Sequence, residues 1–248
     1  MDPLLIVKTG TTFASLAAEC GDFEDWIAAG MELGGSQLVV IAVYEGEALP
    51  DPRSCAGIVV TGSSAMVSDR ETWSERTAKW LHGAVQHETP VLGICYGHQL
   101  LAHALGGRVG PNPRGRQIGT ARVRLVDEAE EDAMLTGFGG SLCAQTTHSE
   151  VVLELPDGAT RLGSTDGDPN TAFSLGNAAW GVQFHPEFDA RVMRRYIEER
   201  RELLFAENID ADARLAAVEE CPEGERLLRR FAELVSGPVG ALPARVNP

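Results

Sequence analysis

Short apolar runs and longer amphipathic segments alternate through the first half of the chain. Apolar strands are predicted at residues 4–7, 38–43, 58–61 and 91–94. Such runs, bounded by Gly, Pro and acidic residues, are typical of strands in a parallel sheet. Residues 70–87 repeat apolar side chains at helical spacing, among them Trp73 and Trp80, and Asp69 is the predicted N-cap. An earlier, weaker helix is expected to end near Gly30.

The pattern changes after residue 117. Short runs of β-forming residues, separated by Asp, Gly, Pro and Ser, predict strands at 117–126, 141–147, 151–155, 160–164, 171–175 and 179–184. Helical spacing returns later, and helices are predicted at 189–205, 211–220 and 223–234, with Gly237-Pro238 ending the last one. Antiparallel hairpins followed by helices are therefore expected in this half.

The order of these elements predicts the fold class. Strands that alternate with helices indicate an α/β fold with a mostly parallel open sheet and helices on both faces, as in flavodoxin-like proteins. Antiparallel hairpins are appended to that sheet. We expect one domain over residues 1–205 and a C-terminal helical extension over residues 206–248, packed on the same domain.

Charge and composition exclude several classes of partner. The formal net charge of −15 argues against nucleic acid, which needs concentrated Lys and Arg. No apolar stretch approaches the ~20 residues of a membrane helix, so no membrane role is predicted. The five cysteines are widely spaced without a CxxC pair, which fits a reducing cytoplasm and predicts neither a disulfide framework nor a metal site. Two small basic clusters are interpreted as solvated surface charge: Arg108/Arg114/Arg116 and Arg191/Arg194/Arg195.

Candidate chemistry begins at Gly93-Ile-Cys95-Tyr-Gly97. This Gly-x-nucleophile-x-Gly pattern lies between a predicted strand and a predicted helix, where a sharp turn lifts the nucleophile above the sheet edge. The helix N-terminus directs backbone N–H groups at the sulfur, which favours a thiolate and can hold an oxyanion. A buried structural cysteine is the simpler alternative at this point.

A second stretch, Trp180 to Phe188, runs from an apolar strand into His185-Pro186-Glu187. Residues two apart in an extended segment point the same way, so His185 and Glu187 can share one face. An imidazole that hydrogen-bonds a carboxylate on one side can take a proton from a thiol on the other. By itself a His-Pro-Glu sequence at a strand end is more often structural.

Together, Gly93-Ile-Cys-Tyr-Gly-His-Gln99 and Gly181-Val-Gln-Phe-His-Pro-Glu187 resemble the two signature motifs of class I, triad-type glutamine amidotransferases. The resemblance covers roughly residues 4 to 205 and is strongest to the amidotransferase domain of GMP synthase and its free-standing relatives. It implies Cys95 as nucleophile, His185 as base and Glu187 as the acid that orients the base.

The resemblance also implies roles around this triad. The oxyanion donors are expected at the N–H of Tyr96 and in the turn Gly62-Ser63, although the family's proline is missing from that turn. Gln99 is expected to contact the α-amino-acid end of the substrate. The segment Thr147-His148-Ser149 is expected to receive the same end, with a structural role for His148 equally open.

The predicted activity is hydrolysis of the side-chain amide of L-glutamine through a γ-glutamyl thioester, with release of ammonia and no cofactor. The chain lacks the ATP motifs of a synthase, so a separate synthase subunit is a possible partner, and the ammonia acceptor is open. Two alternatives remain: a γ-glutamyl hydrolase acting on a larger γ-glutamyl compound, and a non-catalytic regulatory subunit.

Overall fold

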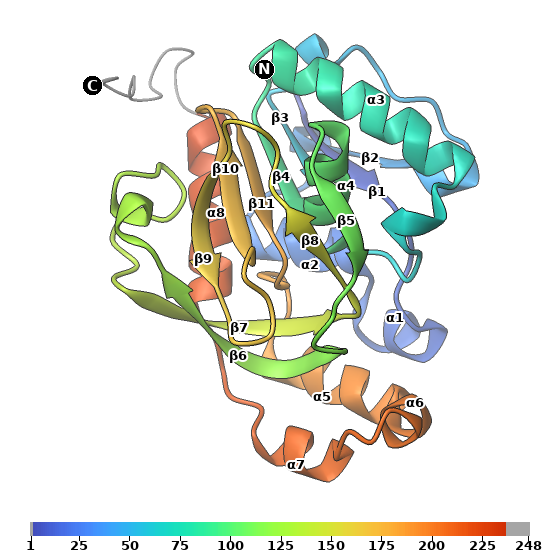
Figure 1. Cartoon of the computed structure of the whole chain (residues 1–248). Coiled ribbons are helices and arrows are strands. Elements are labelled where there is room, and N and C mark those ends of the chain that lie inside the picture. Colours follow the sequence, from blue (N-terminus) through green and yellow to red (C-terminus); the bar gives the residue numbers. More distant parts are fainter. Residues whose placement is uncertain (1, 237–248) are drawn as a thin grey trace.

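The structure is a computed structural model that describes residues 2–236 (Figure 1). Its helices are α1 (Ala14–Cys20), α2 (Phe23–Gly30), α3 (Thr72–Gln86), α4 (Tyr96–Ala104), α5 (Ala190–Glu199), α6 (Arg201–Ala206), α7 (Ala211–Ala216) and α8 (Glu223–Ser236). Its strands are β1 (Leu4–Lys8), β2 (Leu38–Ala42), β3 (Gly57–Val60), β4 (Val91–Ile94), β5 (Arg108–Pro111), β6 (Gln117–Leu125), β7 (Ser141–His148), β8 (Glu150–Glu154), β9 (Thr160–Ser164), β10 (Ala172–Leu175) and β11 (Ala179–Val182). The predicted helix end at Gly237-Pro238 lies outside the described residues.

Within residues 2–236 one sheet has nine strands in the order β2-β1-β3-β4-β11-β10-β9-β6-β7. The strands from β2 to β11 are parallel, and the remaining neighbours are antiparallel. The first four follow the 2-1-3-4 order of flavodoxin-like sheets. The predicted α/β class, with its parallel sheet and appended antiparallel part, is confirmed.

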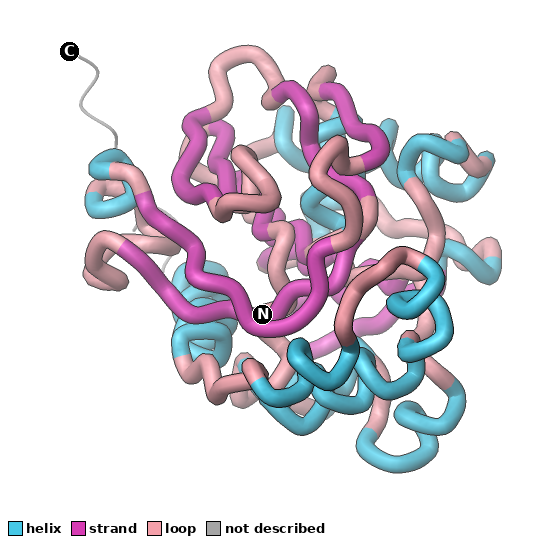
Figure 2. Tube along the Cα trace, turned by 60° about the horizontal axis from the view of Figure 1, so that its bottom comes forward, coloured by secondary structure: helices cyan, strands magenta, loops and turns pink. Residues whose placement is uncertain are grey.

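Helices cover both faces of the parallel strands (Figures 1 and 2). Both faces carry apolar side chains that need cover, because successive side chains of a strand point to opposite faces. In β1, Leu4 and Ile6 pack into one buried cluster, while Leu5 and Val7 pack into the other. The first cluster includes residues of α2 and α8, and the second includes residues of α3 and α4. Each face of the sheet therefore has its own hydrophobic core.

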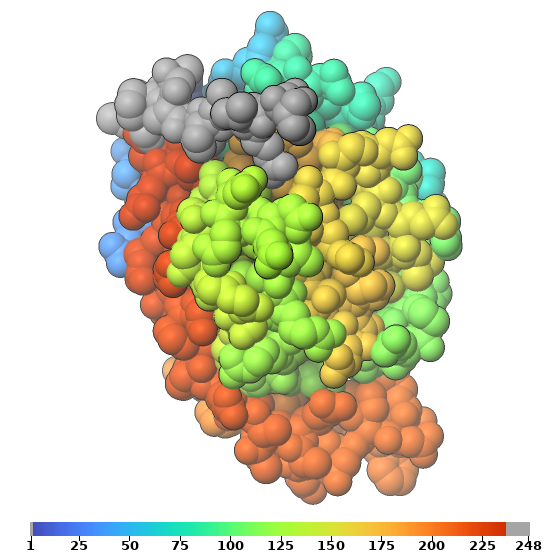
Figure 3. All heavy atoms as spheres, turned by 60° about the vertical axis from the view of Figure 1, so that its left-hand side comes forward, coloured from blue at the N-terminus to red at the C-terminus, as the bar shows by residue number. Residues whose placement is uncertain are grey.

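The C-terminal helices take two positions. Figure 3 shows α5, α6 and α7 at one end of the molecule and α8 running up one side. Leu227, Leu228 and Phe231 of α8 are fully buried in the first cluster. Helix α8 thus packs on the sheet, while the predicted domain over residues 1–205 and the predicted extension over residues 206–248 stay predictions.

Two local predictions were wrong, and one strand was not predicted. Asp69 belongs to a 3-10 turn, Val67–Asp69, and α3 begins only after Arg70 adopts a left-handed conformation with φ of 54°. The predicted helix at 189–205 is interrupted at Arg200, which separates α5 from α6. Strand β5 was not predicted, because its pairing with β8 is a tertiary contact that no local pattern encodes.

The cysteine interpretation also needs correction. Cys143 of β7 and Cys221, in the loop before α8, form a disulfide although 78 residues separate them. Sequence spacing hides such a pair, since the fold alone brings the two segments together. Cys20, Cys55 and Cys95 are free. No helix within residues 2–236 is long and apolar enough to cross a bilayer.

Candidate active site

The turn from β4 to α4 holds Cys95 in a strained backbone conformation. Its φ is 51° and its ψ is −99°, a region that non-glycine residues seldom occupy. The flanking glycines are required by close approach: a Cβ on Gly93 would lie 2.4 Å from the carbonyl oxygen of Gly97. A Cβ on Gly97 would lie 2.3 Å from the carbonyl oxygen of Val60. The Gly-x-Cys-x-Gly pattern thus forms the sharp turn expected of it.

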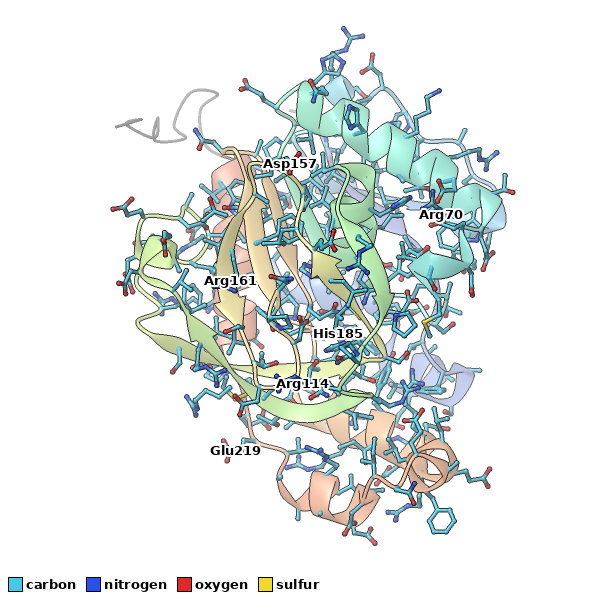
Figure 4. All side chains as sticks on the ribbon, in the orientation of Figure 1. Arg70, Arg114, Asp157, Arg161, His185 and Glu219 are labelled. Atoms are coloured by element: carbon cyan, nitrogen blue, oxygen red, sulfur yellow. A yellow bond between two sulfur atoms is a disulfide. The ribbon has the colours of Figure 1, made fainter. Side chains whose placement is uncertain are left out.

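The neighbouring strand brings His185 to the same sheet edge. Strand β11 pairs in parallel with β4, and the N–H of Cys95 donates to the carbonyl of Val182 at 2.9 Å. Because the two strands end together, the segment after β11 lies beside the turn after β4. Figure 4 shows His185 between the strand ends and the helices α5 and α6.

His185 and Glu187 form a buried ion pair. His185 Nδ1 lies 2.7 Å from Glu187 Oε1, and the side chains are 3% and 0% exposed. Burial alone would lower the pKa of His185, but the charges of Glu187 and Cys95 and the hydrogen bond with Glu187 outweigh it and raise the pKa. The carboxylate therefore holds the Nδ1 side of the imidazole, while the buried Nε2 has no hydrogen-bond partner among the described residues.

Packing fixes the plane of this imidazole. The ring of Phe188 stacks on the imidazole of His185 with centroids 4.1 Å apart. The ring of Phe23 also stacks with this imidazole, at a centroid distance of 6.2 Å. A Cβ on Gly62 would lie 3.0 Å from Cε1 of His185, so the Gly62 turn also touches the ring. Few alternative orientations remain for the His185 side chain.

The turn Gly62-Ser63 is anchored to the end of β1. The hydroxyl of Thr9 donates to the carbonyl oxygens of Thr61 and Gly62, each at 3.0 Å. The N–H of Tyr96, at the start of α4, has no hydrogen-bond partner among the described residues. Both predicted oxyanion positions therefore lie near Cys95, and Ser63 lines the same cavities as that residue.

The predicted substrate residues gather around a cavity beside Cys95 that His185 does not line. Gln99 donates to the carbonyl of Glu150 at 2.8 Å and to the side chain of Gln183 at 3.0 Å. Together with Thr147, His148 and Ser149, Gln99 lines a cavity of about 210 Å³, here called the Gln99 cavity. The thiol of Cys95 donates a long hydrogen bond, 3.8 Å, to the carbonyl of Thr147.

His148 has a structural partner within this cluster. Its Nδ1 lies 2.9 Å from the carbonyl oxygen of Glu150. Burial lowers the pKa of His148 to about 4, although this hydrogen bond would raise it. The ring is therefore neutral at physiological pH, which favours the structural role over a charged contact with substrate.

A second cavity opens on the His185 side of Cys95. It measures about 280 Å³, and its walls include Thr11, Phe13, Phe23, His185 and Tyr196. We call it the His185 cavity. The two cavities share five lining residues, one of them a cation: Ser63, Ser64, Cys95, Thr147 and Arg200.

The family is shown by the sequence itself. Residues 19–202 match the family Glutamine amidotransferase class-I. The chain belongs to the class I glutamine amidotransferases. This family consists of cysteine amidohydrolases, so the chain is a member of an enzyme family.

Two groups of curated relatives resemble this amidotransferase chain. GMP synthase [glutamine-hydrolyzing] of Porphyromonas gingivalis is 36% identical over 147 residues, which is 58% of this chain but only 28% of that protein. Gamma-glutamyl peptidase 5 of Arabidopsis thaliana is 30% identical over 190 residues, which is 75% of each chain. The chain thus spans about a quarter of the length of the GMP synthases and most of the peptidase.

Solved structures support the same fold. A glutamine amidotransferase from Thermotoga maritima has a TM-score of 0.75 at 24% identity and covers 96% of this chain and 100% of its own. A glutamine amidotransferase from Methylobacillus flagellatus has a TM-score of 0.71 at 25% identity, with 95% and 92% covered.

Sequence reasoning missed two residues of this amidotransferase site. Gln183 donates to the sulfur of Cys95 at 3.6 Å; its place two residues before His185, on the same face, was the available signal. Arg200 lines both cavities. The sequence held one indication of this, because residue 200 follows the buried residues Tyr196 and Ile197 at helical spacing and so lies on the same face.

Proposed function

We propose that the chain hydrolyses the side-chain amide of L-glutamine with Cys95 as nucleophile, His185 as base and Glu187 as the acid that orients it. The observation that carries this proposal is the buried 2.7 Å contact between His185 and Glu187, held beside the strained turn of Cys95 at adjacent strand ends. A carboxylate, an imidazole and a thiol in this order are the parts of a nucleophilic triad.

The reaction proceeds in two halves. Cys95 Sγ attacks the amide carbon while His185 holds the thiol proton, and backbone N–H groups at Tyr96 and Gly62-Ser63 stabilise the oxyanion. The C–N bond breaks, the nitrogen takes the proton from His185, and ammonia leaves a γ-glutamyl thioester. Water then gives a proton to His185, attacks the thioester and releases glutamate, which restores Cys95.

Contacts around the sulfur support the placing of glutamine in the Gln99 cavity. The cavity carries Gln99 and the segment Thr147 to Ser149, and the buried Oγ1 of Thr147 has no hydrogen-bond partner among the described residues. Substrate amino and carboxylate groups could supply that partner. The glutamyl part of the substrate would then lie in the cavity that Gln99 lines and His185 does not.

The destination of the ammonia is a separate part of the proposal. The similarity to GMP synthase covers only 28% of that protein. A synthase in another chain could therefore use the ammonia. Helix α6, beside the cavities, leaves Phe205 85% exposed and Leu203 40% exposed. Such apolar exposure supports a docking partner at this end of the molecule.

A larger γ-glutamyl compound is the second candidate substrate. The relative with the widest coverage among the curated proteins named above is a gamma-glutamyl peptidase. The same triad chemistry serves any γ-glutamyl amide, because only the leaving amine differs. The third alternative, a regulatory subunit without activity, is disfavoured because His185 and Glu187 are in contact and Cys95 lines the same cavity as His185.

The test is release of ammonia and glutamate from L-glutamine by the purified chain. Cys95→Ala should abolish release and Glu187→Ala should reduce it, while Cys55→Ala, a free cysteine outside both cavities, should behave as wild type. Equal release by Cys95→Ala and wild type would sink the assignment. γ-Glutamyl peptides tested in parallel distinguish the two candidate substrates.

A further inference from the structure

The two cavities meet at Cys95 but differ in the other residues that line them. His185 lines only the second cavity, and Gln99 lines only the first. In the proposed reaction the leaving nitrogen must take its proton from His185, so the leaving group points into the His185 cavity. The glutamyl group then occupies the Gln99 cavity.

Ammonia does not need a leaving-group cavity of this size. The His185 cavity measures about 280 Å³, whereas one water-sized molecule takes about 30 Å³ of liquid volume. Three aromatic side chains, Phe13, Phe23 and Tyr196, contribute to its wall. These features fit a leaving amine that has an organic body with an apolar part.

The cavity also holds a cation without a carboxylate partner. Arg200 forms no ion pair with any of residues 2–236, and its buried Nε has no hydrogen-bond partner there. Its guanidinium lies over the rings of Phe13 and Tyr196, 5.1 and 5.6 Å from their centroids. The neighbouring Arg116 is different, since Glu207 neutralises it through two hydrogen bonds of 2.8 and 3.1 Å. In a chain of net charge −15, an unpaired half-buried arginine at the site is an available anion receptor.

We propose that the His185 cavity receives the leaving group of a γ-glutamyl α-amino acid and that Arg200 selects this substrate by pairing with its free α-carboxylate. This inference rests on the proposed function and adds the substrate class. Cys95 Sγ attacks the γ-amide carbon, the C–N bond breaks, and the amino-acid nitrogen takes the proton held by His185. Water then hydrolyses the γ-glutamyl thioester, so the products are glutamate and the free amino acid.

The decisive experiment compares three substrates: L-glutamine, γ-L-glutamyl-L-phenylalanine and its C-terminal amide, γ-L-glutamyl-L-phenylalaninamide. The readout is glutamate release, as kcat/KM for each. Wild type should prefer the acid over the amide by about 10- to 100-fold, the range of one charge-assisted contact. Arg200→Met should bring this ratio near one, and Arg200→Lys should keep part of it. Arg201→Met is the matched control, since Arg201 pairs with Asp212 and lies in neither cavity.

Each other outcome overturns the inference in a distinguishable way. An unchanged acid-to-amide ratio in Arg200→Met means that the carboxylate is bound elsewhere. Equal loss on all three substrates means that Arg200 serves the glutamyl group or the fold. Cys95-dependent release from glutamine without any preference for the acid leaves the proposed function standing and overturns only this inference. No release by wild type from any of the three substrates overturns both.

Discussion

Gly224 couples the C-terminal helix to the candidate triad. It lies in the first turn of α8, where a Cβ would stand 2.4 Å from the carbonyl oxygen and 3.0 Å from the Cα of Pro186. Ordinary Cβ contacts begin at 3.4 Å, so Gly224→Ala requires about 1 Å of movement. Because Leu227 and Phe231 anchor α8 in the core, the segment around Pro186 should yield.

The expected effect is larger on catalysis than on stability. Pro186 stands between His185 and Glu187, and a misplacement of about 1 Å in a catalytic group can cost about 100-fold in rate. Overpacking costs about 1–3 kcal/mol, and the gain in helix propensity from Gly to Ala returns up to about 1 kcal/mol. We therefore expect kcat to fall about 10- to 100-fold, with a net loss of about 0–3 kcal/mol in the free energy of unfolding.

Two measurements check this prediction. Glutamate release gives kcat and KM, and guanidinium chloride unfolding gives the free energy of unfolding. Gly34→Ala is the control, because a Cβ there meets nothing within 4 Å. Coupling between α8 and the candidate triad is refuted if Gly224→Ala keeps kcat within twofold of wild type and its free energy of unfolding within about 0.5 kcal/mol of wild type.

Two further predictions concern stability. Gly83 lies in α3 with open space around its Cβ position, so Gly83→Ala should raise the free energy of unfolding by about 0.5–1 kcal/mol in urea titrations; a loss of stability would show an unseen contact. Burial raises the pKa of Asp168 to about 6 from 3.8, although a hydrogen bond from the N–H of Asn170 opposes it. The folded state therefore binds this proton more tightly than the unfolded chain does, and stability falls as pH rises from 4 to 6. Relative to wild type, the free energy of unfolding of Asp168→Asn should rise by about 2.4 kcal/mol between pH 4 and pH 7.5. A difference between the two proteins that does not change with pH would contradict the assignment.

The sequence allowed the central site to be predicted because its two motifs are local. Gly93 and Gly97 indicate a tight turn around Cys95, and only Pro186, whose backbone is rigid, separates His185 from Glu187. What could not be derived from either motif is that β4 and β11 are neighbours. That pairing joins segments far apart in the chain, and the family resemblance implied only that Cys95, His185 and Glu187 act together.

Two misses share one physical cause. Arg200 was not singled out and Cys143 and Cys221 were not predicted to pair, because charge and spacing describe a residue without its tertiary neighbours. Arg200 is half-buried against Phe13, a residue from the other end of the chain. The error at Asp69 is different, since Arg70 adopts a left-handed conformation there and delays the helix start.

The adjacency of β4 and β11 also has a consequence during biosynthesis. Cys95 emerges from the ribosome long before His185 and Glu187, and until β11 pairs with β4 its sulfur lacks the proposed base and the proposed orienting acid. A nascent chain that ends before β11 should therefore carry an ordinary thiol. In the proposed mechanism, reactivity would arise only when β11 pairs with β4, so the folding of this late strand would activate the cysteine.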